Sequence, residues 1–147
     1  MIDHVSIGVS DIDRARRFYR AVLRPLEMRC LVDLPGKAGF GKRYPEFWIL
    51  ARPAMEPHGE DVPGHVALRA GSVAAVEQFH EEACARGGRC DGAPGLRAYT
   101  MANAFAAFVR DPDGNRIEAV HLNPTAPGGR DGNAPEAGTS DPPPETD

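Results

Sequence analysis

The chain has 147 residues, of which 41% are hydrophobic and 26% charged, as expected for one ordinary globular domain with its own core. No apolar run approaches the roughly 18 residues needed to cross a membrane, and the N-terminus lacks a signal-peptide pattern, so we expect a cytoplasmic protein without a membrane partner. The three cysteines are odd in number and lack zinc-site spacing, which predicts reduced thiols.

The net charge of −4 belongs to the C-terminal tail. Residues 125–147 hold one arginine and five acidic residues, so residues 1–124 sum to zero. The tail has no aliphatic residue larger than alanine, and we expect it to be disordered because it cannot offset its ordering entropy by burial. A neutral domain with an acidic tail offers little phosphate-neutralising surface, which argues against nucleic-acid binding.

The first half of the chain begins with an alternating strand over residues 2–9, in which His4 lies on the face opposite the apolar residues. A helix of about three turns should follow, with Ser10 and Asp13 as a capping box, and end before Pro25. Three further strands are expected near residues 28–32, 38–43 and 46–51.

The second half repeats this order. Residues 64–70 alternate like the first strand, and Ser72 opens a second helix. Strands are expected around residue 90 or 96–99, then over 104–110 and 115–121, the last two joined by an Asp-Pro-Asp-Gly-Asn turn. The pairs His4 and His65, Ile12 and Val73, and Phe18 and Phe79 are each 61 residues apart. The chain therefore reads as strand-helix-strand-strand-strand, twice.

This repeat resembles the vicinal oxygen chelate superfamily, which includes glyoxalase I, extradiol dioxygenases, fosfomycin-resistance enzymes and bleomycin-binding proteins. The resemblance rests on His4 and His65 opening the two halves, the Phe18-Tyr19 pair, and the Asp-Pro-Asp-Gly-Asn-Arg-Ile-Glu run that ends at Glu118. It implies an α+β fold in which two βαβββ modules form a cupped mixed sheet around a central cavity. Module one would span residues 1–52, the linker 53–63 and module two 64–124.

The resemblance also implies a metal site. His4, His65 and Glu118 match the ligand positions for a divalent cation that chelates adjacent oxygens of a small-molecule substrate. Two imidazoles and one carboxylate suit Fe(II) and also accept Mn, Ni or Zn. Independently, a carboxylate in the middle of a short apolar strand must be exposed, salt-bridged or bound to a cation. The alternative is that each histidine is simply a hydrogen-bonded strand residue.

Trp48 departs from the superfamily pattern. It stands where module one would repeat Glu118, a position that often supplies a fourth ligand, and a three-ligand site resembles a dioxygenase or a minimal metal site more than glyoxalase I. Tyr99 is the candidate catalytic acid or orienting group. Arg69, on the strand face of His65, and Arg97 are candidate substrate-binding residues.

Two function classes remain open. The first is a metal-dependent lyase or dioxygenase, and the second is a metal-free, drug-sequestering protein of the bleomycin-resistance type. In the second, the aromatic side chains of Phe40, Phe47, Trp48 and Tyr99 would stack on a ligand.

A complete site needs His4 from module one and His65 with Glu118 from module two, which can meet within one chain or between two chains. Pairing with a second copy would also cover exposed sheet edges, and we therefore predict a homodimer.

Overall fold

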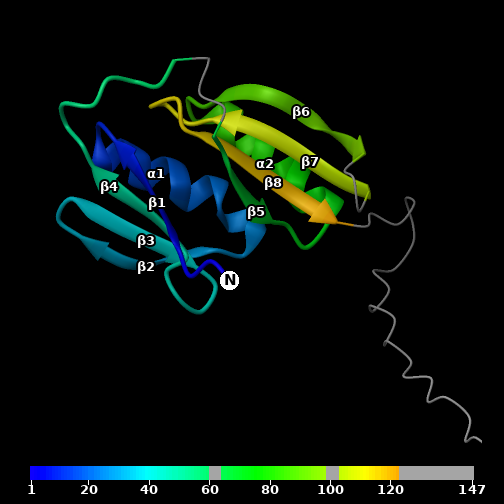
Figure 1. Cartoon of the computed structure of the whole chain (residues 1–147), viewed down its shortest axis with the longest axis horizontal. Coiled ribbons are helices and arrows are strands. Elements are labelled where there is room, and N and C mark those ends of the chain that lie inside the picture. The colour runs from blue at the N-terminus through cyan, green and yellow to red at the C-terminus, as the bar shows by residue number, and fades with distance from the viewer. Residues whose placement is uncertain (60–63, 99–102, 123–147) are drawn as a thin grey trace, which may run out of the picture.

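The computed structural model describes residues 1–59, 64–98 and 103–122 (Figure 1). The expected repeat is confirmed. Module one contains β1 (Val5–Val9), α1 (Ile12–Val22), the 3₁₀ helix η1 (Arg24–Leu26), β2 (Arg29–Leu34), β3 (Lys37–Gly41) and β4 (Phe47–Ala51). Module two contains β5 (Val66–Arg69), α2 (Val73–Ala85), β6 (Arg89–Ala98), β7 (Asn103–Arg110) and β8 (Arg116–Leu122). Within these ranges no helix has the length and apolar character needed to cross a membrane.

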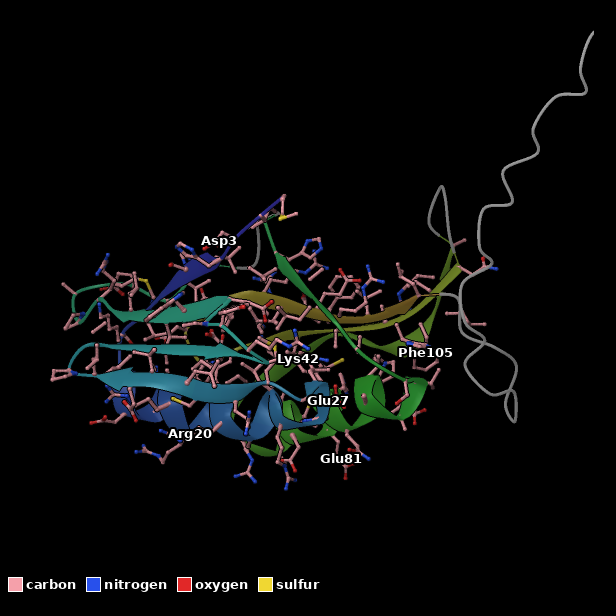
Figure 2. The ribbon with its side chains drawn as sticks, turned by 90° about the horizontal axis from the view of Figure 1, so that it is seen from below. Asp3, Arg20, Glu27, Lys42, Glu81 and Phe105 are labelled. Carbon is pink, nitrogen blue, oxygen red and sulfur yellow. The ribbon has the colours of Figure 1, made fainter. Side chains whose placement is uncertain are left out.

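The eight strands form two four-stranded mixed sheets of the same topology. Their orders are β1-β4-β3-β2 and β5-β8-β7-β6, so the first strand of each module is an edge strand. In each sheet the first strand of the module (β1 or β5) pairs in parallel with the last one (β4 or β8), and the other pairs are antiparallel. Helices α1 and α2 pack against each other and lie together on one side of the two sheets (Figure 2).

One core runs beneath both sheets. Strand alternation directs Phe47 and Ile49 of β4, and Ile117 of β8, toward the helices, where Phe18 and Phe79 are also buried. Each such side chain contributes roughly 1.5–3 kcal/mol when it is fully buried. The side chains at the other alternating strand positions, which include the predicted site, therefore face away from the helices.

The first helix begins at a different cap from the one predicted. Asp11, not Ser10, is the N-cap, and its carboxylate accepts hydrogen bonds from the backbone N–H of Asp13 and Arg14. Ser10 does not cap the helix because its hydroxyl instead donates a hydrogen bond to Asp113 of module two. The second helix is capped by Ser72, as the sequence indicates.

The turn at residues 111–115 joins module two to module one. Asp111 accepts a 2.7 Å hydrogen bond from the Tyr19 hydroxyl of α1, and the Asn115 amide donates both to Asp111 and to the carbonyl of Gly8. Gly114 supplies the positive φ of the turn, at 84°. The motif that carries the resemblance is thus a buried polar joint between the halves, directly before the strand that holds Glu118.

Candidate functional site

Two of the three predicted metal ligands meet in module two. His65 directly precedes β5 and Glu118 lies in β8, and because these strands run parallel with Ala67 opposite Glu118, the two side chains share one sheet face. His65 Nε2 lies 2.9 Å from Glu118 Oε2, and the side chains are 36% and 4% exposed. A carboxylate this deeply buried is tolerated only with a polar partner, and His65 supplies one.

The His65 ring is held by an aromatic and ionic stack. Phe108, directly opposite Glu118 on β7, packs edge-on against the imidazole at 5.5 Å between ring centroids. The Arg116 guanidinium lies 4.6 Å from the centre of the Phe108 ring and is hydrogen-bonded to Asp91. Such a cation–π contact stabilises the arrangement by about 0.5–1 kcal/mol at a part-exposed site. This stack limits the movement of the imidazole.

Asp91 remains ionised beneath this stack. Burial alone would raise its pKa, but hydrogen bonds from Arg110 and Arg116 outweigh burial and lower the pKa below its usual value. The carboxylate therefore neutralises part of the positive charge beside His65. Arg116 lies on the same strand face as Glu118, and its guanidinium is ion-paired with Asp91.

His4 does not join the other two predicted ligands. It precedes β1 in module one, its side chain is 52% exposed, and its Nδ1 lies 2.6 Å from the carboxylate of Asp3. Throughout the described ranges, no three histidine, cysteine, aspartate or glutamate side chains come together in a way that could hold a metal ion. A single chain thus gathers His65 and Glu118 only.

Trp48 lies on the outward face of module one. It is paired with Ser6 of β1, and its ring lies across Gly39, where an added Cβ would approach the ring to 3.1 Å. Its indole Nε1 donates to the Pro45 carbonyl at 3.2 Å, and Lys37 Nζ is 5.8 Å from the ring centre. The indole is therefore a fixed, half-buried platform at the position where module two carries Glu118.

Phe40 and Phe47 do not line a ligand cavity, contrary to the prediction. Both are fully buried in the core, with ring centroids 6.1 Å and 5.1 Å from that of Tyr19. The cause is strand parity. Gly39 takes the outward position next to Phe40, and Trp48 takes the one next to Phe47, so both phenylalanines face the helices.

The remaining predicted site residues differ in what the structure shows of them. Arg69 is exposed at the end of β5, on the strand face of His65. Arg97 instead turns back onto its own strand, donating to the carbonyls of Leu96 and Ala93. Tyr99, the candidate catalytic residue, lies outside the described residues.

Phe108 and Asp91 belong to this site but were not predicted from the sequence. Residues 105–109 are apolar on both strand faces, so alternation of residue type did not distinguish the outward Phe108 from its inward neighbours. Asp91 could not have been found in this way, because the pairing of β6 with β7 shifts register between Cys90 and Gly92.

The comparison with protein families gave one match. Residues 1–119 match the Glyoxalase/Bleomycin resistance protein/Dioxygenase superfamily. A comparison with curated protein sequences found no significant match.

Solved structures share the fold. A glyoxalase/bleomycin resistance protein from Albidiferax ferrireducens T118 is 31% identical, with a TM-score of 0.70 over 81% of this chain and 97% of that one. The fosfomycin resistance protein FosX from Mesorhizobium loti is 17% identical, with a TM-score of 0.59 over 82% and 91% of the two chains. A V278E glyoxalase I mutant from Zea mays is 22% identical, with a TM-score of 0.61 over 80% of this chain and 44% of that one.

Proposed function

The chain belongs to the Glyoxalase/Bleomycin resistance protein/Dioxygenase superfamily, and we propose that it is a small metal-dependent enzyme of the glyoxalase or dioxygenase type. Its substrate would be a small molecule with two adjacent oxygen atoms. The observation that carries this proposal is the pairing of His65 with the buried Glu118, because a hydrogen-bonded imidazole and carboxylate on one sheet face form two thirds of a facial metal-ligand set.

The distance within this pair fits neighbouring ligands of one cation. Two donor atoms that are each about 2.1 Å from a metal, at right angles, lie roughly 3 Å apart. His65 Nε2 and Glu118 Oε2 are 2.9 Å apart. Fe, Mn, Ni and Zn all accept imidazole and carboxylate ligands, so these donor atoms are compatible with each of the four metals.

We place the third ligand, His4, in a second copy of the chain, which makes the active form a homodimer. Three features support this arrangement. His4 is half-exposed, the strands that follow His4 and His65 are both edge strands in the described part of the chain, and the outward face of module one carries the half-buried Trp48 with the exposed Leu34. A second copy would cover these edges and this face.

The roles of the chain's own residues follow from this placement. The cation, when bound, supplies a Lewis acid that polarises a substrate oxygen. His65 is kept in place by Phe108 and Arg116. Trp48 of the second copy would form a flat apolar wall, and Arg69 would attract an anionic substrate group. Tyr99 remains the sequence-based candidate for the catalytic acid.

Metal-free ligand binding is the second candidate function. It is favoured by Trp48 at the position of a fourth carboxylate, and by an apolar cluster on the outward face of the second sheet: Ala104, Ala106, Val120, Phe108 and Leu122. In this case the cluster and the indole would enclose a planar ligand. The three free thiols support a reducing compartment such as the cytoplasm for either function.

Metal analysis together with thermal unfolding tests the proposal. Protein purified without chelator should contain a divalent metal, and a cation at a hundredfold excess over its Kd should stabilise the fold by about 2.7 kcal/mol. His65→Ala should abolish this stabilisation, whereas His58→Ala, at an exposed linker histidine, should keep it. A wild-type melting temperature unaffected by chelator and by added Mn, Fe, Ni and Zn would reject the metal. Quenching of Trp48 fluorescence by an aromatic ligand in metal-free protein would support the second function.

A further inference from the structure

Arg110, the last residue of β7, is an arginine enclosed by three other segments of the chain. Its side chain is 6% exposed. The guanidinium donates hydrogen bonds to Asp91 Oδ1 of β6 at 3.3 Å, to the Gly59 carbonyl of the linker at 3.2 Å and to the Gly114 carbonyl of the turn at 3.3 Å. A buried cation is tolerated only where a counterion and hydrogen-bond acceptors surround it. Arg110 therefore ties the linker and the turn to Asp91.

One connection from Arg110 to the candidate metal site runs through side chains. The two oxygens of Asp91 are shared between Arg110 and Arg116. Arg116, held in this way, lies over the ring of Phe108, which packs edge-on against the His65 imidazole. Loss of Arg110 would remove one of the two restraints on Asp91. The position of the stack against His65 therefore depends on Arg110.

A second connection runs along the chain. The linker is docked on module two, because the His58 N–H donates to the Asp113 carbonyl at 2.8 Å and Arg110 holds the carbonyl of Gly59. Gly59 lies six residues before His65. The strand β5 begins directly after His65 and pairs only with β8 in the described part of the chain. Strand ends with few contacts open most easily, so docking of the linker restrains the end of β5 at which His65 lies.

We propose that Arg110 is a positioning residue of the candidate metal site and that it fixes His65 through both connections. This inference rests on the proposed role of His65 and Glu118 as metal ligands. Ligand side chains must be held within about 0.5 Å of the productive geometry, which requires support from the residues behind them. The planar guanidinium suits this task because its rigid set of N–H donors reaches acceptors in several directions, whereas a lysine ammonium is a single compact charge on a flexible stem.

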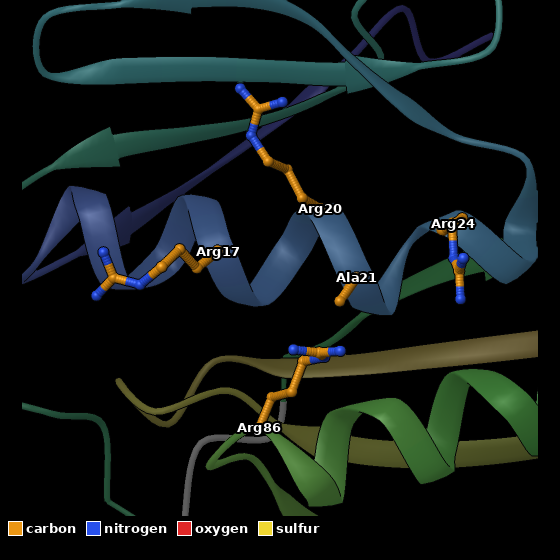
Figure 3. Close-up of a pocket in the computed structure, with 5 residues that line it drawn as sticks. All are labelled: Arg17, Arg20, Ala21, Arg24 and Arg86. Atoms are coloured by element: carbon orange, nitrogen blue, oxygen red, sulfur yellow. The ribbon is translucent and has the colours of Figure 1, made fainter.

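The arginines on the helix side of the molecule provide a matched control. An open hollow there is lined by Arg17, Arg20, Ala21, Arg24 and Arg86 (Figure 3). The helices lie on the side of the sheets opposite the outward face that carries the candidate site (Figure 2). Arg20 is 51% exposed and pairs with Asp33 of module one at 2.7 Å. Arg20→Lys therefore alters an ion-paired arginine in the same way as Arg110→Lys, but away from the linker and from Asp91.

Nuclear magnetic resonance of the metal-free, full-length protein tests the positioning role directly. In Arg110→Lys the imidazole signals of His65 should shift, whereas those of His4, in module one, should keep their wild-type positions. The amide hydrogen of His58 should exchange about tenfold faster, because the linker loses the contact that holds Gly59. Arg20→Lys should leave both measurements unchanged. A purely structural loss of stability would not move the signals of one histidine selectively.

Metal affinity then relates the position of His65 to the proposed function. Arg110→Lys should bind Mn or Zn about tenfold more weakly, as is typical when a residue that supports a ligand is changed, and Arg20→Lys should stay within twofold of the wild type. Asp91→Asn removes the charge shared by Arg110 and Arg116, and it should also shift the His65 signals if Arg110→Lys fails to fold.

The outcomes separate this inference from the proposed function. Unchanged His65 signals in Arg110→Lys and Asp91→Asn, equal effects of Arg20→Lys, or wild-type metal affinity in a folded Arg110→Lys protein would each overturn the positioning role. A wild-type protein that binds no metal would reject the proposed function. If the His65 signals still shifted selectively in Arg110→Lys, the hold of Arg110 on His65 would nevertheless stand.

Discussion

The hydroxyl of Tyr19, in α1, donates a hydrogen bond of 2.7 Å to Oδ2 of Asp111, which lies 92 residues further along the chain. Both groups are buried, and Asp111 also accepts from the Asn115 amide and from the backbone N–H groups of Asp113 and Asn115. Burial raises the pKa of Asp111 despite these hydrogen bonds, which act to lower it. A fully hydrogen-bonded carboxylate therefore ties the two modules together next to the strand that carries Glu118.

Removing the hydroxyl should destabilise the protein without altering its packing. Tyr19→Phe keeps the ring but leaves one oxygen of Asp111 with fewer donors, and we expect a loss of about 1.5–3 kcal/mol of unfolding free energy, the range for a hydrogen bond to a charged group. Tyr44→Phe is the matched control, because Tyr44 is 72% exposed, and should change stability little. Equal unfolding free energies for Tyr19→Phe and the wild type in urea would show that the Tyr19–Asp111 hydrogen bond does not stabilise the fold.

The same pair predicts a loss of stability in alkali. Burial, and then the negative charge of Asp111, raise the pKa of Tyr19 well above 10. Below about pH 10 the hydroxyl is protonated in both the folded and unfolded states, so its contribution is fully present. Above that pH the unfolded chain releases the proton more readily, and stability should fall by up to about 1.4 kcal/mol per pH unit.

The alkaline effect can be assigned by mutation. Unfolding free energies measured between pH 8 and 11 should fall more steeply for the wild type than for Tyr19→Phe, since the variant cannot ionise at this position. Parallel curves for the two proteins would show that other groups cause the alkaline loss.

Local patterns in the sequence were enough to find both helices and most of the strands, whereas the family resemblance indicated that His65 and Glu118 belong to one site. Alternation identified the strands, and the parallel pairing of β5 with β8 then placed both side chains on one face. The aromatic character of Phe40 suggested ligand stacking, but alternation along β3 directs this side chain to the core. Residue type alone, without the position in the strand, does not show which face of the sheet a side chain occupies.

Features that depend on contacts between modules escaped prediction. Ser10 had the spacing of a helix cap, but Asp113 of the other module takes its hydroxyl, and Asp11 caps the helix instead. The strand β6 is ten residues long and includes residue 90 as well as residues 96–98, which the sequence offered as alternative positions for this strand. Its register shifts and the distant partner of Ser10 are tertiary effects that no local pattern encodes.

Deletion of residues 125–147 should leave the folded domain unchanged. These residues contain no large aliphatic or aromatic side chain, so they have little apolar surface to bury. We expect the truncated chain to keep the melting temperature and metal response of the full chain. A fall of several degrees in melting temperature on truncation would show that the tail contributes packing that its composition does not indicate.

Mixing two inactive variants tests how the metal site is assembled. His4→Ala and Glu118→Ala should each fail to bind the metal, provided that thermal unfolding shows both to be folded. After the two are refolded together, a site shared between chains would be restored in the mixed dimer, where His4 of the Glu118→Ala chain meets His65 and Glu118 of the other. Random pairing makes half of the dimers mixed, each with one intact site of two, so metal binding should return to roughly a quarter of the wild-type level.

A site built within one chain would give no recovery, and a monomeric mass in solution would exclude sharing altogether. Because a single chain gathers His65 and Glu118 but leaves His4 paired with Asp3, we expect recovery.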